Sequence, residues 1–189
     1  MHLKKIYSVG YPIGANEVKI DSPDNDGNGE IIVKGNNVML GYMNDEQATK
    51  EVMTDDGFYR TGDIGYLDKD GYVYITGRKK NVIILSNGKN IYPEEIEEYL
   101  SRIDMIKECV VVGRAASQSS EVLITAIVYP DFEKFSEDYS IGEIEAEIKK
   151  AVTLINKELP TFKHINHVEI RDIEFEKTTS KKIIRYKVK

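Results

Sequence analysis

Residues 59–63 read Tyr-Arg-Thr-Gly-Asp, residues 77–80 read Gly-Arg-Lys-Lys, and residues 87–97 read Asn-Gly-Lys-Asn-Ile-Tyr-Pro-Glu-Glu-Ile-Glu. The segments between these polar, glycine-containing elements are rich in the β-branched and aromatic residues that are typical of strands. Carboxylate, guanidinium and ammonium groups bind polar ligands, and glycine lets a ligand approach the backbone closely. We therefore expect the three elements to be the functional part of the chain.

The composition indicates a globular protein that binds small molecules. Of the 189 residues, 41% are hydrophobic and 31% are charged, which is enough for one good core or two small ones. The net charge of −6 disfavours nucleic acid or an anionic membrane surface as the main partner, because both select for basic patches. We expect small-molecule ligands, no nucleic acid, and at most peripheral contact with a membrane.

Three features favour a cytoplasmic location. The N-terminal Met-His-Leu-Lys-Lys lacks the apolar stretch of a signal peptide, and no segment approaches the roughly 20 apolar residues of a spanning helix. Cys109 is the single cysteine, so no internal disulfide can form. Since it lies in the apolar run Cys-Val-Val-Val, we expect a buried structural thiol.

The first part of the chain is predicted to be β-rich. Short strand candidates alternate with turn-rich segments, which favours a small barrel or sandwich. The expected strands are Glu17–Ile20, Glu30–Lys34, Val38–Leu40, Ile64–Leu67 and Tyr72–Ile75. Asn44 is expected to cap a helix over residues 45–53. Gly71 can supply the positive φ that the turn over residues 68–71 needs.

After Arg78 the pattern predicts alternating strands and helices. The expected strands cover residues 82–85, 108–112, 122–128 and 167–170, and the expected helices run from Pro93 to about residue 103 and from about 141 to 159. These elements fit a compact lobe of about a hundred residues. The predicted fold class is α+β: a β-rich, barrel-like part over residues 1–77, a hinge over 78–81, and an α+β domain over 82–189.

Asp63 and Arg78 have side chains suited to a nucleotide. Asp63 follows Thr61-Gly62, where glycine lets the chain turn, and its two carboxylate oxygens match the paired hydroxyls of a ribose. The alternative is a turn or capping aspartate. Arg78 offers a planar fork of donors to phosphate or ribose oxygens, while Lys79 and Lys80 add flexible point charges. From composition alone, this basic cluster can equally be a solvated surface.

Two later segments also allow two interpretations. Gly88 either lets a slender ligand slide along the backbone or only forms a hairpin turn. Residues 177–185 read Lys-Thr-Thr-Ser-Lys-Lys-Ile-Ile-Arg, which by composition is a solvated C-terminal tail.

No metal site is expected. Residues 24–29 match the early positions of an EF-hand calcium loop, but its twelfth position is Gly35, where a bidentate glutamate is needed. The histidines have no cysteine or acidic partner at zinc spacing: His2, His164 and His167.

The order of Tyr59-Arg-Thr-Gly-Asp63, a hairpin, Gly77-Arg78 and Ile91-Tyr-Pro-Glu-Glu-Ile-Glu97 resembles the adenylate-forming superfamily. This superfamily includes acyl-CoA synthetases, peptide-synthetase adenylation domains and firefly luciferases. The segment Lys177–Arg185 is similar to its terminal loop, which carries a catalytic lysine before an isoleucine. The resemblance extends over nearly the whole chain.

The resemblance implies roles for five residues. Asp63 would hold the ribose of ATP, with Arg78 also binding the nucleotide. Lys80, two residues after this arginine, would be the hinge of the C-terminal domain. Gly88 would line the passage for the pantetheine thiol of CoA. Lys182 would be the catalytic lysine, binding the substrate carboxylate together with the α-phosphate as negative charge accumulates.

On this resemblance, the chain is the last third of a longer enzyme, and residues 1–77 are a remnant of its large N-terminal domain. The missing part would bind the acid and supply most ligands of ATP and Mg, so the fragment alone is expected to be inactive. Lys181 stands where many members have glycine, a pattern familiar among long-chain fatty acyl-CoA synthetases. The intact enzyme is expected to convert a fatty acid into acyl-AMP and then into acyl-CoA.

Two alternatives stay open. The chain can be a stand-alone, non-catalytic binding or regulatory module of the same fold. It can also belong to an adenylating enzyme that loads a carrier protein, because CoA and carrier proteins present the same thiol arm. Whether the gene continues upstream into a phosphate loop and a large α/β domain distinguishes the first alternative from the enzyme.

Overall fold

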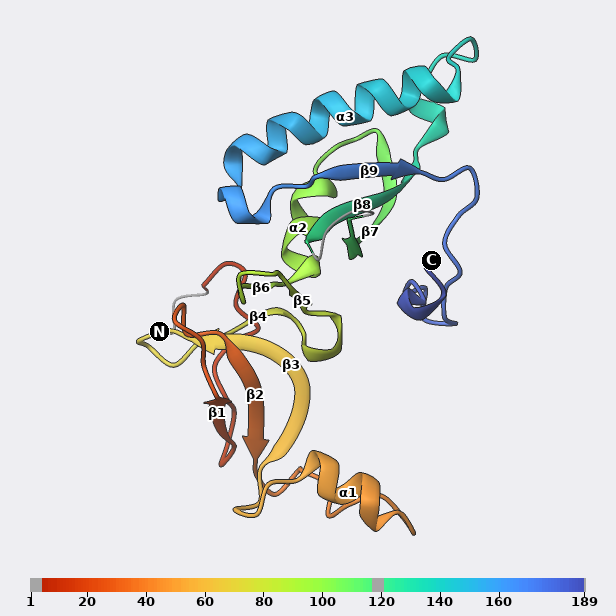
Figure 1. Ribbon diagram of the computed structural model, residues 1–189. Helices are drawn as coiled ribbons and strands as arrows, with labels where there is room; N and C mark the ends of the chain where they lie inside the picture. The colour runs from red at the N-terminus through yellow and green to blue at the C-terminus, as the bar shows by residue number, and fades with distance from the viewer. Residues whose placement is uncertain (1–4, 117–120, 189) are drawn as a thin grey trace. The chain divides into compact units, whose positions relative to one another are not determined.

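The structure is a computed structural model, and it describes residues 5–116 and 121–188. The chain divides into two compact units, Met1–Asn81 and Val82–Lys189. Each unit combines helix and sheet (Figure 1), which confirms the predicted α+β class. The hinge over residues 78–81 stays a prediction.

The first unit is built on a four-stranded antiparallel sheet in the order β1-β2-β3-β4. Its strands are β1 (Glu17–Asp21), β2 (Gly29–Lys34), β3 (Tyr59–Leu67) and β4 (Val73–Arg78). In Figure 1 the long β3 curves strongly along its length. Apolar side chains buried in this unit include Ile31, Ile32, Phe58, Ile64 and Val73.

The expected strand Val38–Leu40 is wrong. The Val38 N–H donates to the Gly35 carbonyl at 3.1 Å in a turn, and the Leu40 side chain is fully exposed. Three apolar residues are too few to form a stable ladder when no neighbouring strand pairs with them.

The short helix α1 (Glu46–Val52) has a different cap from the expected one. The Asp45 carboxylate accepts a hydrogen bond from the Ala48 N–H at 2.9 Å. Asn44 precedes this cap with a φ of 56°, outside the extended range of an N-cap residue. The predicted helix therefore exists, with its cap one residue later.

The turn between β3 and β4 is confirmed. The Asp68 Oδ1 atom accepts from the N–H groups of Asp70 and Tyr72, at 2.9 and 3.0 Å. Gly71 closes the turn with a φ of +80°, a conformation that glycine adopts without steric cost.

In its described residues, the second unit has a hairpin, a three-stranded sheet and two α-helices. Its elements are β5 (Ile83–Ile84), β6 (Asn90–Ile91), α2 (Pro93–Leu100), β7 (Ile106–Ala115), β8 (Val122–Pro130), α3 (Ile141–Glu158) and β9 (His167–Ile170). Strand β8 pairs antiparallel with β7 and parallel with β9, so α3 makes the crossover that a parallel pair requires. Single 3₁₀ turns occur at Lys79–Asn81, Phe132–Lys134, Thr161–Lys163 and Arg185–Lys187.

Helix α2 is shorter than expected. It ends at Leu100 because Arg102 and Ile103 donate backbone hydrogen bonds to carbonyls three residues back, which tightens the last turn. Helix α3 agrees with its pattern: Ser140 and Glu143 form a capping box at its start. Within the part of the chain that the structure describes, no helix is long and apolar enough to cross a membrane.

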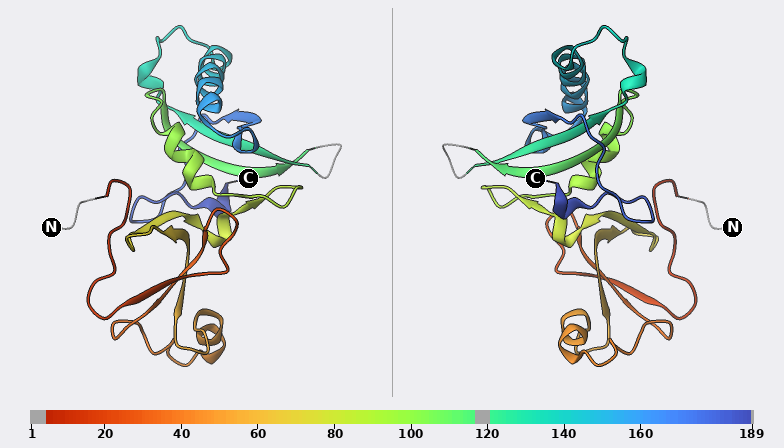
Figure 2. Two further views of the ribbon diagram at one scale, coloured as in Figure 1. Left: turned by 90° about the vertical axis from the view of Figure 1, so that its left-hand side faces the viewer. Right: turned by 90° about the vertical axis from the view of Figure 1, so that its right-hand side faces the viewer.

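The two faces of the β7-β8-β9 sheet are covered by different parts of the second unit. Val111, Ala126 and Val128 belong to the main core, together with side chains of α2, α3 and the β5–β6 hairpin. Val110 and Ile127 point to the other face, where Phe175 completes a second core and residues of the C-terminal segment pack. Figure 2 shows α3 on one side of these strands and the blue C-terminal segment on the other.

Candidate functional site

Asp63 lies in a bulge within β3, and not in a turn before a strand as the sequence suggested. Ile32 pairs with Arg60 and Glu30 pairs with Ile64, so residues 61–63 face the single residue Ile31. Extra residues of this kind bend a strand and change the direction of its side chains. The bulge therefore gives Asp63 an orientation that regular strand pairing would not.

The neighbours of Asp63 stabilise this bulge. Gly62 has a φ of +71°, which favours glycine. The Thr61 hydroxyl donates to the Ile31 carbonyl at 2.7 Å and accepts from the Asp63 N–H at 3.0 Å. The sequence signal for this arrangement was the Thr-Gly pair, but its effect depends on the partner strand β2.

The structure brings the two predicted nucleotide-binding residues together. Asp63 and Arg78 are directly opposite on β3 and β4, and Arg78 Nε lies 2.7 Å from Asp63 Oδ1. The side chains of Asp63 and Arg78 are 22% and 50% exposed, so ligands can reach both. An acceptor beside a fixed fork of donors suits a ligand with adjacent hydroxyl and anionic oxygens.

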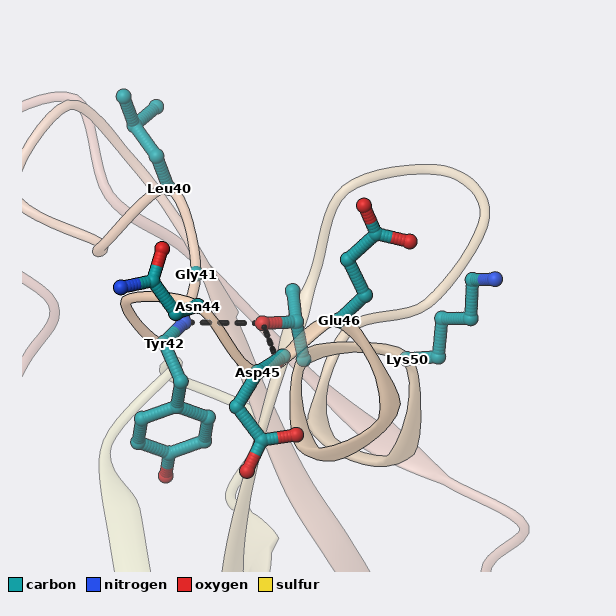
Figure 3. A pocket seen from close by; sticks show the side chains of 8 residues that line it. Leu40, Gly41, Tyr42, Asn44, Asp45, Glu46 and Lys50 are labelled. Atoms are coloured by element: carbon teal, nitrogen blue, oxygen red, sulfur yellow. Dashed lines mark hydrogen bonds between the residues drawn. The ribbon is translucent and has the colours of Figure 1, made fainter.

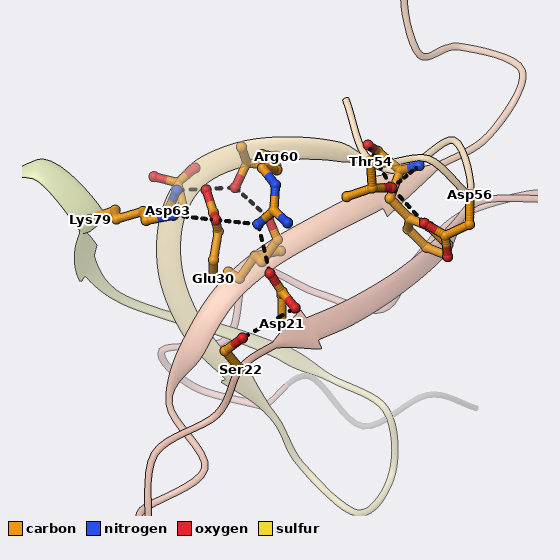
Figure 4. Close-up of polar contacts among 11 residues, drawn as sticks. Asp21, Ser22, Glu30, Thr54, Asp56, Arg60, Asp63 and Lys79 are labelled. Atoms are coloured by element: carbon orange, nitrogen blue, oxygen red, sulfur yellow. Dashed lines mark hydrogen bonds and ion pairs between the residues drawn. The ribbon is translucent and has the colours of Figure 1, made fainter. Parts of the chain in front are cut away.

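The two lysines that follow Arg78 differ in their contacts. Lys79 Nζ lies 2.8 Å from the Glu30 carboxylate (Figure 4), so this side chain is attached to the first unit. Lys80 is exposed, and its ammonium has no hydrogen bond or ion pair with any residue in the described ranges. Both lysines and Asn81 belong to the first unit, and Lys79 is tied to it by an ion pair with Glu30.

Gly88 lies at the exposed tip of the β5–β6 hairpin. Its N–H donates to the Leu85 carbonyl at 2.8 Å, and the Leu85 N–H donates to the Lys89 carbonyl at 3.0 Å. Its φ is +78°, and a Cβ atom placed there would meet nothing within 4 Å. The positive φ accounts for a glycine at this position, and the tip also exposes backbone that no side chain covers.

Lys182 projects from a closed loop, where the composition alone suggested a solvated tail. Lys177 and Ile183 form a bridge, and the Thr178 N–H donates to the Lys182 carbonyl at 2.8 Å. The Thr178 hydroxyl also accepts from the Lys182 N–H at 3.2 Å. The Lys182 ammonium is exposed and makes no ion pair with the residues that the structure describes.

Lys181 has a φ of +62°, in the left-handed region that favours glycine. This is the position at which the sequence departs from many members of the superfamily it resembles. The loop therefore requires a left-handed residue here, and lysine adopts that conformation at a steric cost of about 1–2 kcal/mol.

Arg185 and Lys177 anchor the two sides of this loop. The Arg185 guanidinium contacts the Glu97 carboxylate of α2 and donates to the Val111 carbonyl of β7 at 3.4 Å. Lys177 contacts the Glu108 carboxylate of β7. These contacts fix the loop to the sheet, so the backbone of Lys182 has a defined position.

Burial affects two groups below this loop. It raises the pKa of the Glu97 carboxyl, although the Arg185 charge and the Val111 N–H, at 2.6 Å, favour the ionised form. Burial also raises the pKa of the Cys109 thiol to about 12, with the Glu97 charge as a second cause. Cys109 is half-buried, and not fully buried as expected, and the raised pKa favours the neutral thiol.

The other polar motifs are structural. Asp24 Oδ1 accepts from the N–H groups of Asp26 and Asn28, which makes residues 24–28 a side-chain-stabilised turn. His164 contacts the Leu159 carbonyl at 3.1 Å, and His2 lies outside the described residues. No group of histidine, cysteine and acidic side chains in the described ranges could hold a metal ion.

An open pocket of about 520 Å³ lies beside α1 (Figure 3). One of its polar groups joins the loop to the helix: the Thr49 hydroxyl accepts from the Tyr42 N–H at 2.9 Å and donates to the Asp45 carbonyl at 2.8 Å. These contacts attach the preceding loop to α1. None of the predicted site residues lines the pocket, so we interpret it as structural.

Residues 80–189 match the family model of the AMP-binding enzyme C-terminal domain. Over 98% of its length, the chain is 34% identical to the long-chain-fatty-acid–CoA ligase FadD15 of Mycobacterium tuberculosis, of which it covers 32%. The chain belongs to the adenylate-forming, AMP-binding superfamily.

Two further relatives of this adenylate-forming chain act on a different acid. It is 35% identical to the 2-succinylbenzoate–CoA ligase of Listeria monocytogenes, over 99% of this chain and 36% of the ligase. The o-succinylbenzoate CoA synthetase of Bacillus subtilis, solved with its acyl-adenylate intermediate, matches with a TM-score of 0.77 and 30% identity. That match covers 98% of this chain and 36% of the synthetase, so the chain spans about a third of these relatives.

Proposed function

We propose that this chain is the C-terminal third of an ATP-dependent acid–CoA ligase, which converts a carboxylic acid into acyl-AMP and then into acyl-CoA. The observation that carries the proposal is the position of two loops in the second unit. The Gly88 hairpin packs through Ile83 and Ile91 on one face of the β7-β8-β9 sheet. The Lys182 loop packs through Ile183 on the opposite face. One small domain thus carries two exposed loops, and a rotation can present either of them to the same ligand.

The first loop to act is the Lys182 loop. The ammonium of Lys182 is exposed and unpaired among the described residues, so no partner has to be displaced before a substrate binds. It would contact the acid carboxylate and the α-phosphate while the carboxylate oxygen attacks phosphorus and pyrophosphate leaves. A positioned positive charge stabilises the negative charge that accumulates there.

The nucleotide site lies in the first unit. Asp63 would accept hydrogen bonds from the ribose hydroxyls, and Arg78 would remain beside it as a donor to nucleotide oxygens. We infer that the groups that bind the triphosphate and Mg lie mostly in the preceding part of the protein. The Bacillus subtilis synthetase has also been solved with ATP and a magnesium ion.

The Gly88 hairpin would act in the second step. A rotation about Lys80 would replace the Lys182 loop by the bare backbone at Gly88, along which the pantetheine arm of CoA reaches the acyl carbonyl. The thiolate sulfur then attacks this carbonyl and AMP leaves. A carrier-protein phosphopantetheine would use the same passage, because it presents the same thiol arm.

A long-chain fatty acid is the substrate we propose first. The lysine at position 181, a pattern of fatty acyl-CoA synthetases, and the similarity to a long-chain-fatty-acid–CoA ligase support it. The similarity to 2-succinylbenzoate–CoA ligases supports an aromatic acid as the second candidate.

The test uses the full-length protein that contains this chain. Pyrophosphate release is measured with ATP and Mg over a panel of saturated fatty acids and aromatic acids, and thioester formation is measured with CoA and with a phosphopantetheinylated carrier protein. We expect acid-dependent pyrophosphate release and acyl-CoA formation with fatty acids. If no acid in either group supports pyrophosphate release, the proposed function is wrong.

A further inference from the structure

Glu30 on β2 is a buried charge that the nucleotide site does not use directly. It is the only buried charged side chain in the described part of the chain, with 7% of its surface exposed. A buried carboxylate is stable only when cations and donors compensate the loss of water. The cations that contact Glu30 therefore identify the segments of the first unit that this carboxylate holds in place.

A single oxygen of Glu30 accepts hydrogen bonds from two cations. Arg60 Nη1 donates to Oε2 at 2.9 Å, and Lys79 Nζ donates to the same atom at 2.8 Å (Figure 4). Burial by itself raises the pKa of the Glu30 carboxyl, but hydrogen bonds from Lys79 and Arg60 outweigh this effect, and the pKa lies below its ordinary value. Glu30 is therefore an ionised group between two cations that would otherwise repel each other.

The two cations belong to two functional segments. Arg60 directly precedes the bulge that orients Asp63, and Glu30 is opposite Ile64, where regular pairing of β2 with β3 begins again. Lys79 directly follows β4 and precedes Lys80. One charge therefore contacts both the residue before the bulge and the residue before the proposed hinge lysine, Lys80.

The two contacts can be separated experimentally because Arg60 has a second partner. Its Nη1 atom also donates to Asp21 Oδ2 on β1 at 2.6 Å, and Asp21 is directly opposite Glu30. Asp21 has a direct ion pair with Arg60 and feels Lys79 only through its more distant charge, so it provides a control that acts mainly on the Arg60 branch.

We propose that Glu30 is a positioning residue that couples the Asp63 bulge to the start of the linker. Through Arg60 it keeps the bulge in register, and through Lys79 it holds the residue that precedes the proposed hinge lysine, Lys80, on the first unit. The bulge part of this inference rests on the proposed nucleotide site, whereas the linker part does not.

Three substitutions in the full-length protein test the coupling. Glu30→Gln keeps the shape and an acceptor oxygen but removes the shared charge. Asp21→Asn weakens mainly the Arg60 branch, and Lys79→Met removes the linker branch. Each variant is measured for the KM of ATP in pyrophosphate release, for kcat, and for backbone hydrogen exchange at residues 79–81.

The expected results differ between the variants. Glu30→Gln raises the KM of ATP and the exchange rate at residues 79–81 by about tenfold each, because hydrogen bonds to charged groups are among the strongest. Asp21→Asn raises the KM of ATP about threefold, as for a half-exposed ion pair, and leaves exchange at 79–81 unchanged. Lys79→Met raises that exchange about tenfold and leaves the KM of ATP unchanged.

The coupling is overturned if Glu30→Gln lowers the melting temperature and leaves the KM of ATP unchanged. In that case amide exchange would rise equally over β1 to β4 and residues 79–81, with no additional increase at 79–81. It is also overturned if Lys79→Met has no effect on residues 79–81. If the wild-type protein releases no pyrophosphate, the proposed function fails on its own. The exchange measurements still decide whether Glu30 holds Lys79.

Discussion

The Gly88 hairpin and the Lys182 loop both contain a residue with a positive φ, but the residue type differs between them. Both need a left-handed residue, with φ of +78° at Gly88 and +62° at Lys181. Glycine adopts this conformation freely, whereas lysine does so at a steric cost. Both close through backbone hydrogen bonds of their own, and the Lys182 loop is in addition held by Arg185 and Lys177 on acidic side chains of α2 and β7.

The geometry of the two loops has different origins. A glycine turn needs little from the rest of the fold, so the hairpin tip is defined locally. The Lys182 loop contains a strained residue, and such residues persist only where the surrounding contacts determine them. Its position is therefore a property of the whole second unit.

The largest expected effect is the loss of the Lys182 ammonium from its loop. Lys182→Ala in the full-length protein should lower the rate of acyl-adenylate formation by about 100-fold or more, since it removes a group that stabilises developing charge. Thioester formation from a supplied acyl adenylate should stay near the wild-type rate. Both half-reactions are measured by rapid quench.

Lys181→Asn is the matched control, because asparagine tolerates the left-handed conformation and also removes a lysine charge. It should leave both half-reactions near the wild-type rate. An equal loss in both half-reactions for Lys182→Ala would remove Lys182 from the catalytic position.

The second prediction removes the anchor that distinguishes the Lys182 loop from the hairpin. Arg185→Met leaves the partly buried Glu97 carboxylate, 16% exposed, without its cation, which should destabilise the loop locally by roughly 2 kcal/mol. By this estimate, amide exchange over residues 177–188 in the full-length protein should rise about 30-fold. Exchange at the Gly88 hairpin should not change.

The double variant Arg185→Met with Glu97→Gln provides the control. It removes the unpaired charge and should recover part of the protection, because a neutral pair costs less to bury than an isolated carboxylate. Equal exchange in the single variant and the wild type would show that Arg185 does not anchor the loop.

The third prediction separates the two interpretations of Gly88. Gly88→Asn keeps a left-handed turn but adds a side chain at the tip, so thioester formation should slow by about tenfold if a thiol arm passes there. Adenylate formation should remain at the wild-type rate. Wild-type thioester formation in this variant would leave Gly88 as a turn residue only.

The elements were predictable where the sequence pattern is strong. Helix α3 has apolar residues at helical spacing after a Ser140–Glu143 capping box, and β8 is an apolar run long enough for a central strand. The Asp68–Gly71 turn followed from local turn chemistry. In each case the residues that determine the element lie within it.

The site was predictable as a set of motifs and not as geometry. The bulge at Asp63 depends on which residues of β2 face β3, and the Glu30 contacts join residues 30 and 49 positions apart, so no local pattern indicates them. The Val38–Leu40 prediction failed for the same reason, since a strand needs a partner. For Lys181 the signal was present in the glycine that many members of the superfamily have.

The smallest expected effect comes from placing glycine at position 181, so that both loops have glycine at their left-handed position. Lys181→Gly relieves a steric cost of about 1–2 kcal/mol, but it adds about 0.5–1 kcal/mol of unfolded-state entropy, so the net local stabilisation should be about 0.5 kcal/mol. Amide exchange over residues 178–183 should slow about twofold, with the rate of adenylate formation unchanged because Lys182 is retained. Faster exchange in this variant would mean that the contacts of Arg185 and Lys177, and not the left-handed residue, limit the stability of the loop. The difference between the Lys182 loop and the Gly88 hairpin would then lie in these side-chain contacts alone.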